Sequence, residues 1–166
     1  MLLVIVNWIY ALFIAYSYGN LVNIVSYKMF GYRMKNADAY VMSGLVAATV
    51  YAQVFSLFGG VGLLANVILV AGAVLSLCVS PKGTKENFCE IRNHTNGVCL
   101  IVTAVPLVLW AYFSSRGYIH YDSDLYHGQS IRWIEEYGVV PGLGNLHNRL
   151  AYNSASFALS ALFSMK

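Results

Sequence analysis

Two long stretches of this sequence carry no charge. The first charged side chain is Lys28, and a second uncharged run extends over residues 39–79. About 20 apolar residues in an α-helix cross the hydrocarbon core of a bilayer. Residues 2–25 therefore suffice for one spanning helix, and the second run has roughly the length of two spans. This pattern predicts membrane helices near the start of the chain.

Glycines divide the second run. Gly59, Gly60 and Gly62 interrupt it, and glycine's backbone freedom suits a tight turn. The run thus predicts a hairpin of two helices, over residues 39–58 and 61–79. A fourth apolar run predicts a helix over residues 96–115. Pro106 lies inside this helix, and neighbouring helices in a membrane bundle tolerate such a kink.

Composition supports the same fold class. Charged residues make up 10% of the chain and hydrophobic residues 58%, whereas a soluble domain is about 25% charged. Such a chain has too few polar side chains to cover an aqueous surface, so membrane lipids are its expected surroundings. The small net charge of +3 is spread over short clusters, which argues against a nucleic-acid partner. We expect an all-α, polytopic transmembrane helix bundle.

Basic residues in short loops mark the cytoplasmic side of a membrane protein. Two loops carry them, after the first and third predicted helices: Lys28, Arg33 and Lys35, then Lys82, Lys85 and Arg92. Four crossings place both loops on one side of the membrane, so we expect residues 116–149 on the extracytoplasmic side.

The sequence therefore predicts three parts. Residues 1–115 form a four-helix transmembrane region, and residues 116–149 form an extracytoplasmic loop with an interfacial helix. Residues 150–166 begin a further membrane helix, which makes four to five in all. Since the chain stops inside that apolar run, we expect it to be the N-terminal portion of a longer protein.

Residues 117–153 hold most of the chemically active side chains, including three of the four histidines. Asp122 and Ser123 offer a helix cap, and Gly138 a natural stop. Between them the helical period separates two faces. One face contains Tyr126, His127, Ser130, Ile131, Trp133, Ile134 and Tyr137, and the other Gln129, Arg132, Glu135 and Glu136. Such an amphipathic helix is expected to lie along the membrane interface.

The first turn of this helix allows three interpretations. Asp122 can act as a general base if an apolar surface raises its pKa. Alternatively, His120, Asp122, Asp124 and His127 supply the oxygen and imidazole ligands of a divalent cation. In the third interpretation these residues only cap a helix and solvate a loop. Their spacing alone leaves all three open.

Three segments carry a resemblance: DSDLYH (122–127), GVVPGLGNLH (138–147) and RLAYNS (149–154). They resemble the first extracytoplasmic loop of GT-C-type membrane glycosyltransferases, closest to an uncharacterised bacterial branch. The resemblance implies transfer of a sugar from a polyprenyl-phosphate donor to an acceptor at the outer face of the bacterial cytoplasmic (inner) membrane. A divalent cation, Mg²⁺ or Mn²⁺, often assists in that family.

The resemblance also implies roles for particular residues. Asp122 matches the catalytic acid position, and Asp124 is the second candidate acid. Tyr126 matches a recurrent aromatic residue. His127, His147 and Arg149 are candidates for contacts with a sugar or phosphate, and Asp122, Asp124 and His120 are the candidate metal ligands.

A non-enzymatic function is the alternative. The chain would then be an integral membrane subunit or scaffold of a cell-envelope complex, with other membrane proteins as partners. The acids and histidines of the outer loop would then only provide a polar, water-exposed surface.

Overall fold

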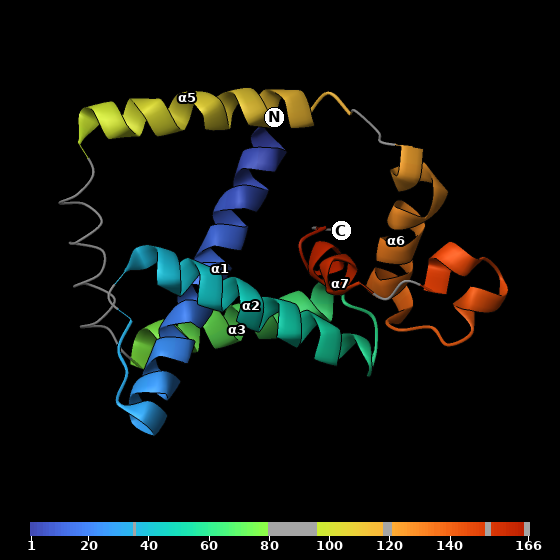
Figure 1. The fold of residues 1–166 in the computed structure, drawn as a ribbon, viewed down its shortest axis with the longest axis horizontal. Coiled ribbons are helices and arrows are strands. Elements are labelled where there is room, and N and C mark those ends of the chain that lie inside the picture. The colour runs from blue at the N-terminus through green and yellow to red at the C-terminus, as the bar shows by residue number, and fades with distance from the viewer. Residues whose placement is uncertain (35, 80–95, 118–120, 152–153, 165–166) are drawn as a thin grey trace. The chain divides into compact units, whose positions relative to one another are not determined.

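The computed structural model describes residues 1–34, 36–79, 96–117, 121–151 and 154–164 (Figure 1). Within these ranges the chain forms six α-helices and no strand. The all-α prediction is therefore confirmed.

The chain divides into two compact units. Unit 1 combines Met1–Gly44 with Ala73–Tyr118, and unit 2 combines Leu45–Gly72 with Ile119–Lys166. This division differs from the predicted boundaries at residues 115 and 149. The reason is that the glycine turn of the predicted hairpin is bonded through its backbone to the polar segment. A boundary drawn along the sequence cannot show such a contact.

Two helices are long and apolar enough to cross a membrane: α1 (Leu2–Phe30) and α2 (Ala37–Ser56). With 29 residues, α1 measures about 43 Å, more than the roughly 30 Å of a hydrocarbon core. It runs beyond the predicted end near residue 25 and stops at Gly31, which has a φ of 68°. The Gly31 N–H donates to the Tyr27 carbonyl over 3.0 Å and so caps the helix.

Two further apolar helices are shorter. α3 (Leu63–Val79) has 17 residues and α5 (Gly97–Ser114) has 18. Both lie where the sequence predicts the third and fourth helices. By length and composition, two helices in the described ranges meet the expectation for a membrane span, whereas the sequence predicts four to five.

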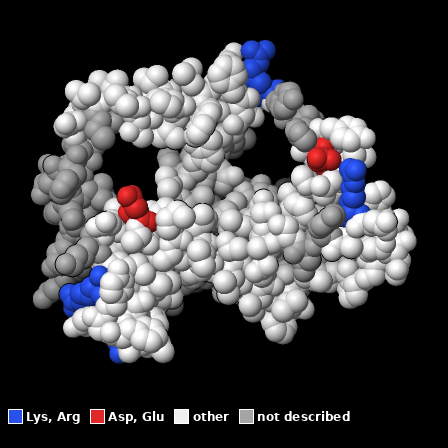
Figure 2. Space-filling model, in the orientation of Figure 1, with Lys and Arg blue, Asp and Glu red and all other residues white. Residues whose placement is uncertain are grey.

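The apolar helices bury little of their surface. On α5, Ala111 is buried, while Ile101 and Trp110 are 65% and 69% exposed. On α1, Leu3 is 81% exposed and Ile9 62%. Figure 2 shows charged side chains at only a few separate points of the face drawn. Soluble monomers rarely expose such extended apolar surface, so these side chains are suited to a lipid environment.

Small residues set the packing of α1 against α2 in unit 1. A Cβ atom on Gly44 would overlap the Ala15 carbonyl, and one on Gly19 would overlap the Tyr40 carbonyl. Small residues at such contacts let membrane helices approach closely.

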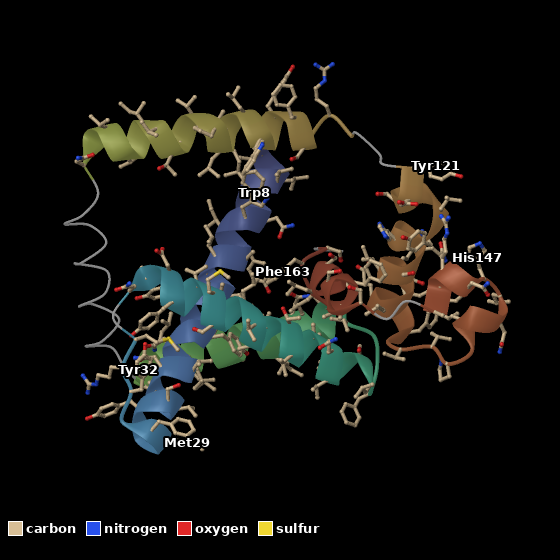
Figure 3. The ribbon with its side chains drawn as sticks, in the orientation of Figure 1. Trp8, Met29, Tyr32, Tyr121, His147 and Phe163 are labelled. Atoms are coloured by element: carbon tan, nitrogen blue, oxygen red, sulfur yellow. The ribbon has the colours of Figure 1, made fainter. Side chains whose placement is uncertain are left out.

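Polar side chains connect α1 to α3 within the same unit. Asn20 Nδ2 donates to the Ser76 carbonyl over 3.0 Å, and Ser76 Oγ donates to the Ser17 carbonyl over 2.6 Å. All three residues are buried. Farther along α1, Asn23 Nδ2 donates to Tyr40 Oη over 2.8 Å. The helix then ends near Met29, with Tyr32 just beyond it (Figure 3).

Unit 2 contains the predicted interfacial helix. It begins as a turn of π-helix, η1 (Ser123–His127), and continues as α6 (Gly128–Tyr137) up to the predicted stop at Gly138. Two 3₁₀ turns follow, η2 (Leu143–Asn145) and η3 (Asn148–Ala151).

The helix predicted from residue 150 starts later. Ser154 caps it by accepting a hydrogen bond from Ser156 N–H over 3.3 Å, and α7 comprises Ala155–Leu162. Because α7 packs on α6, Phe157 and Leu162 are buried. Whether a membrane span begins here stays a prediction.

Candidate functional site

Asp122 and Arg149 come together across the loop of unit 2. Arg149 Nη1 lies 3.4 Å from Asp122 Oδ1, and their side chains are 49% and 35% exposed. The backbone of Asp122 is helical, with φ −68° and ψ −23°, and its side chain makes no cap hydrogen bond. The predicted capping role is therefore wrong, because the carboxylate faces Arg149 instead of the N–H groups of the first turn.

Aromatic rings adjoin this ion pair. The Arg149 guanidinium carbon lies 5.6 Å from the centroid of the Tyr126 ring, within the range of a cation–π contact. Tyr126 meets His127 edge to face at 4.2 Å, and the His127 ring lies 5.2 Å from Phe157. Helix α7 thereby supports the turn that carries both candidate residues.

A π-helical turn positions these rings. Gly128 N–H donates to the Ser123 carbonyl, five residues back, and a Cβ atom on Gly128 would lie 3.0 Å from that oxygen. Glycine therefore allows the wider turn at this position. π-Helical turns inside α-helices occur frequently at functional sites.

His147 contacts the cluster through a hydrogen bond with the backbone of Arg149. Its Nδ1 accepts a hydrogen bond from Arg149 N–H over 3.2 Å, which orients the imidazole in an exposed bend. Five predicted site residues thus gather in unit 2; they are Asp122, Tyr126, His127, His147 and Arg149.

Two predicted residues cannot be assessed in this way. His120 and the side chain of Asp124 lie outside the described residues, although the backbone of Asp124 belongs to η1. Among the residues that the structure describes, no three His, Cys, Asp or Glu side chains gather as metal ligands. Of the predicted ligands with a described side chain, Asp122 faces Arg149 and His127 packs against Tyr126 and Phe157. Whether His120, Asp122 and Asp124 bind a divalent cation therefore stays a prediction, and we derive no step through one.

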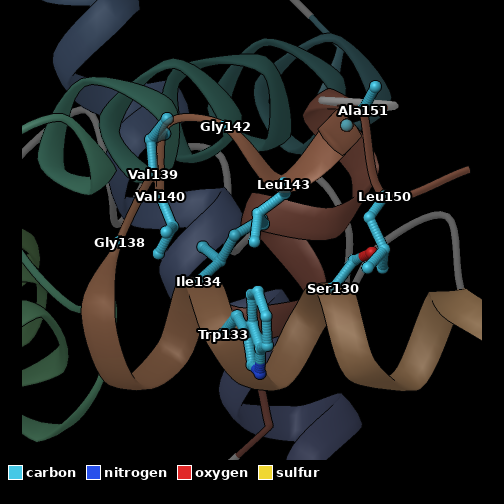
Figure 4. A pocket seen from close by; sticks show the side chains of 11 residues that line it. Ser130, Trp133, Ile134, Gly138, Val139, Val140, Gly142, Leu143, Leu150 and Ala151 are labelled. Carbon is cyan, nitrogen blue, oxygen red and sulfur yellow. The ribbon is translucent and has the colours of Figure 1, made fainter. Parts of the chain in front are cut away.

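Beside the cluster, α6 and the glycine-rich bend line a half-open cavity of about 270 Å³ (Figure 4). Its lining is largely apolar: Trp133, Ile134, Val139, Val140, Leu143, Leu150 and Ala151, with Gly138, Gly142, Gly144 and Ser130. Because Leu150 follows Arg149 directly, the cavity adjoins the cluster along the chain.

Ser130 is the residue that sequence reasoning missed. It is 6% exposed, lines the cavity, and its Oγ has no hydrogen-bond partner among the residues that the structure describes. The signal was present, since Ser130 is the one aliphatic hydroxyl group of a helix face that is otherwise aromatic, aliphatic or histidine. Periodicity placed Ser130 on this face but could not show that a cavity lies beside it.

The arrangement offers three groups to a ligand. The Asp122 carboxylate can accept a proton or hydrogen bond, the Arg149 guanidinium can bind an anion, and the cavity can hold apolar atoms. About half of the Arg149 side chain remains exposed beside Asp122. An amphiphile with a negatively charged head matches this combination.

Comparison with known proteins gives one family. A family model described as "Domain of unknown function (DUF8201)" matches residues 1–166. No curated protein and no solved structure matches.

Proposed function

Because this chain belongs to the DUF8201 family, whose description names no activity, we propose its function from its own residues. The proposal is that it forms the N-terminal part of a membrane glycosyltransferase. This enzyme would transfer a sugar from a polyprenyl-phosphate donor to an acceptor hydroxyl at the outer face of a bacterial cytoplasmic membrane.

One observation carries the proposal. Asp122 and Arg149 are 27 positions apart in the sequence, yet their charged groups lie 3.4 Å apart beside the Tyr126 ring. Glycosyl transfer to a hydroxyl needs a base for the acceptor and positive charge for the departing phosphate. The pair supplies both groups, and the motif resemblance independently points to Asp122.

In the proposed step, Asp122 accepts the proton of the acceptor hydroxyl while its oxygen attacks the anomeric carbon. The bond between that carbon and the phosphate oxygen breaks, and polyprenyl phosphate leaves with the electron pair. Arg149 offsets the negative charge that develops on the phosphate. Tyr126 and His147 orient Arg149 through the ring contact and the backbone hydrogen bond.

The membrane setting belongs to the same proposal. α1 and α2 span the bilayer, and the shorter α3 and α5 cross it as well, with lengths of about 25–27 Å. The lysine and arginine residues of the short loops face the cytoplasm. Four crossings then bring α6 to the outer surface, where its amphipathic faces suit the interface.

The test uses the full-length protein in the organism that carries the gene. Polyprenyl-phosphate-linked sugars are quantified by mass spectrometry in a strain that lacks the gene. The measurement is repeated in three complemented strains, which express the parental protein, the Asp122→Asn variant or the Glu136→Gln variant. Glu136 is a matched control because it is an exposed acid on α6 that pairs with Arg132 outside the cluster.

We expect one linked sugar to accumulate without the gene. The parental protein and Glu136→Gln should restore its consumption, whereas Asp122→Asn should lower the rate of transfer at least about 100-fold, as loss of a general base does. Consumption at the parental rate by Asp122→Asn would refute the assignment. An unchanged lipid-linked pool in the strain without the gene would instead favour a non-catalytic membrane subunit.

A further inference from the structure

The cavity beside α6 combines features that seldom occur together. It holds about 270 Å³, its side chains carry no charge, and it contains one buried hydroxyl without a partner, that of Ser130. A buried hydroxyl that forgoes its hydrogen bond costs about 1–3 kcal/mol. A serine inside a helix can avoid this cost by donating to the carbonyl four residues earlier. Ser130 does not do so, and its hydroxyl therefore remains available to a ligand (Figure 4).

The lining defines the body of that ligand. Ile134, Val140, Leu143 and Leu150 present aliphatic surface, and Trp133 adds an aromatic ring. A sugar would need several hydrogen-bond partners in such a site, whereas the described lining side chains offer only the Ser130 hydroxyl and the Trp133 indole N–H. A hydrocarbon chain suits the lining, provided that one oxygen near its head reaches Ser130.

The neighbouring charge defines the head. Arg149 directly precedes the lining residue Leu150 in the chain, and about half of its side chain is exposed. Asp122 Oδ1 also contacts the Arg149 guanidinium, at Nη1 over 3.4 Å. The other N–H groups of the guanidinium can therefore donate to a phosphate. An ester oxygen between chain and phosphate would then lie near Ser130.

We infer that this cavity binds the hydrocarbon chain of a phosphate-bearing membrane lipid. Ser130 donates to the ester oxygen that joins chain to head, and Arg149 contacts the phosphate. The inference rests on the proposed function only for the identity of the lipid, because a polyprenyl phosphate and a phosphatidic acid share this chemistry.

Photo-crosslinking of the full-length protein in membranes tests the inference. Two probes are used, a polyprenyl phosphate and a phosphatidic acid, each with a photoreactive group on a chain carbon near the head. Peptides that contain cavity residues 130–151 are then identified by mass spectrometry. Labelling of these peptides by either probe supports the inference and identifies the lipid. Labelling by neither probe, or only of peptides from α1, α3 or α5, overturns it.

The Ser130→Ala variant distinguishes a role of the Ser130 hydroxyl in lipid binding from a role in the stability of the fold. The substitution removes only the oxygen, so the unfolding midpoint of the lipid-free protein should stay unchanged or rise. Labelling should fall about 10-fold at limiting probe, the effect of one lost hydrogen bond of about 1.4 kcal/mol. Unchanged labelling, whether or not the unfolding midpoint falls, would rule out the role of Ser130 in binding the lipid.

Filling the cavity gives a second test with a matched control. Val140→Trp should abolish labelling, because its indole would occupy the space of the chain. Leu146→Trp adds a similar volume at a side chain that is 72% exposed and outside the cavity, so labelling should persist. If both variants label equally, the cavity is not the binding site.

Asp122→Asn distinguishes this inference from the proposed function. The variant keeps Ser130, the lining and Arg149, so it should be labelled as strongly as the parental protein even though transfer is lost. If Asp122→Asn is labelled and also transfers sugar normally, the lipid site stands and the catalytic assignment fails. If transfer depends on Asp122 but no probe labels the cavity, the catalytic assignment stands and the lipid site fails.

Discussion

At the scale of single residues, two glycines determine how closely α1 and α2 approach. Gly19 and Gly44 each face a backbone carbonyl of the other helix, at Tyr40 and Ala15, and no side chain fits between them. Lipid provides no hydrophobic drive for helices to associate, so close van der Waals packing of this kind holds membrane helices together. The two glycines therefore serve packing rather than flexibility.

Substitution of Gly44 by alanine should destabilise unit 1. The added methyl group overlaps the Ala15 carbonyl, and overpacking of this kind costs roughly 1–3 kcal/mol. Gly97→Ala is the matched control, because nothing lies within 4 Å of a Cβ atom there. Unfolding by SDS in detergent micelles measures both free energies. Equal midpoints for the two variants would contradict the close approach.

The buried side-chain contact in which Asn20 Nδ2 donates to Ser76 Oγ over 3.4 Å should contribute measurably. A double-mutant cycle with Asn20→Ala and Ser76→Ala is expected to give a coupling energy of about 0.6 kcal/mol, and at most about 1.7 kcal/mol. A cycle of Asn20→Ala with Thr49→Ala serves as the control, because Thr49 bonds to the Leu45 carbonyl of its own helix. That control should give a coupling near zero. A comparable value in both cycles would argue against the α1–α3 contact.

At the scale of elements, the turn between α2 and α3 is bonded to the C-terminal end of α6 and the residue that follows Gly138. Val61 N–H donates to the Ile134 carbonyl over 2.9 Å, and Val139 N–H donates to the Ser56 carbonyl over 2.7 Å. Gly60 and Gly138 allow this approach, since a Cβ atom on either would meet backbone oxygens. Ser164 Oγ also donates to Glu135 Oε1 over 2.9 Å, beyond the end of α7. The site-bearing helix is thereby tied to apolar helices within unit 2.

Gly138→Ala should break this attachment. Gly138 has a φ of 77° and a ψ of −148°, a conformation that is essentially restricted to glycine. Together with the overlap on Ser56, the substitution is expected to cost about 3 kcal/mol or more. Gly142→Ala is the control, because its φ of 86° is strained but the nearest atom, Asn145 Nδ2, lies at 3.6 Å. It should cost about 1–2 kcal/mol.

Limited proteolysis and thermal unfolding in detergent distinguish these two variants. Cleavage between residues 138 and 150 should accelerate far more in Gly138→Ala than in Gly142→Ala. If the two variants behave alike, backbone strain alone accounts for the effect and the attachment to Ser56 contributes nothing.

At the scale of the whole molecule, the apolar surface and the sparse charge are typical of a chain that associates with a membrane. α1 and α2 are long enough for a bilayer, and large apolar side chains are exposed along α1, α2, α3 and α5. Basic side chains concentrate in the loops after the first and third apolar helices. These features together predict an orientation that can be tested in cells.

A cysteine at Leu146 should react with a membrane-impermeant thiol reagent in intact spheroplasts. Leu146 is 72% exposed and lies in the predicted outer segment. The background protein carries serine in place of its three cysteines. A cysteine at Asn36, in the loop between α1 and α2, should react only after lysis. The reverse pattern would invert the topology and remove the proposed chemistry from the outer face.

Much of the fold could be predicted from local patterns. Uncharged runs located α1, α2, α3 and α5, and a glycine stop located the end of α6 at Gly138. The structure brings Asp122, Tyr126 and Arg149 together, and the roles that the resemblance implies for them stay predictions. Boundaries that depend on single side chains were missed, such as the start of α7, where Ser154 acts as the cap.

By itself, the sequence determined which segments are helical and apolar, because hydropathy and helical period are properties of neighbouring residues. Only the tertiary structure decided that Asp122 pairs with Arg149 instead of capping a helix, and that Gly19 and Gly44 face carbonyl groups. It also decided that a cavity remains beside the buried hydroxyl of Ser130. The physical reason is that ion pairs, close approaches and cavities depend on distances between segments that are remote in the chain.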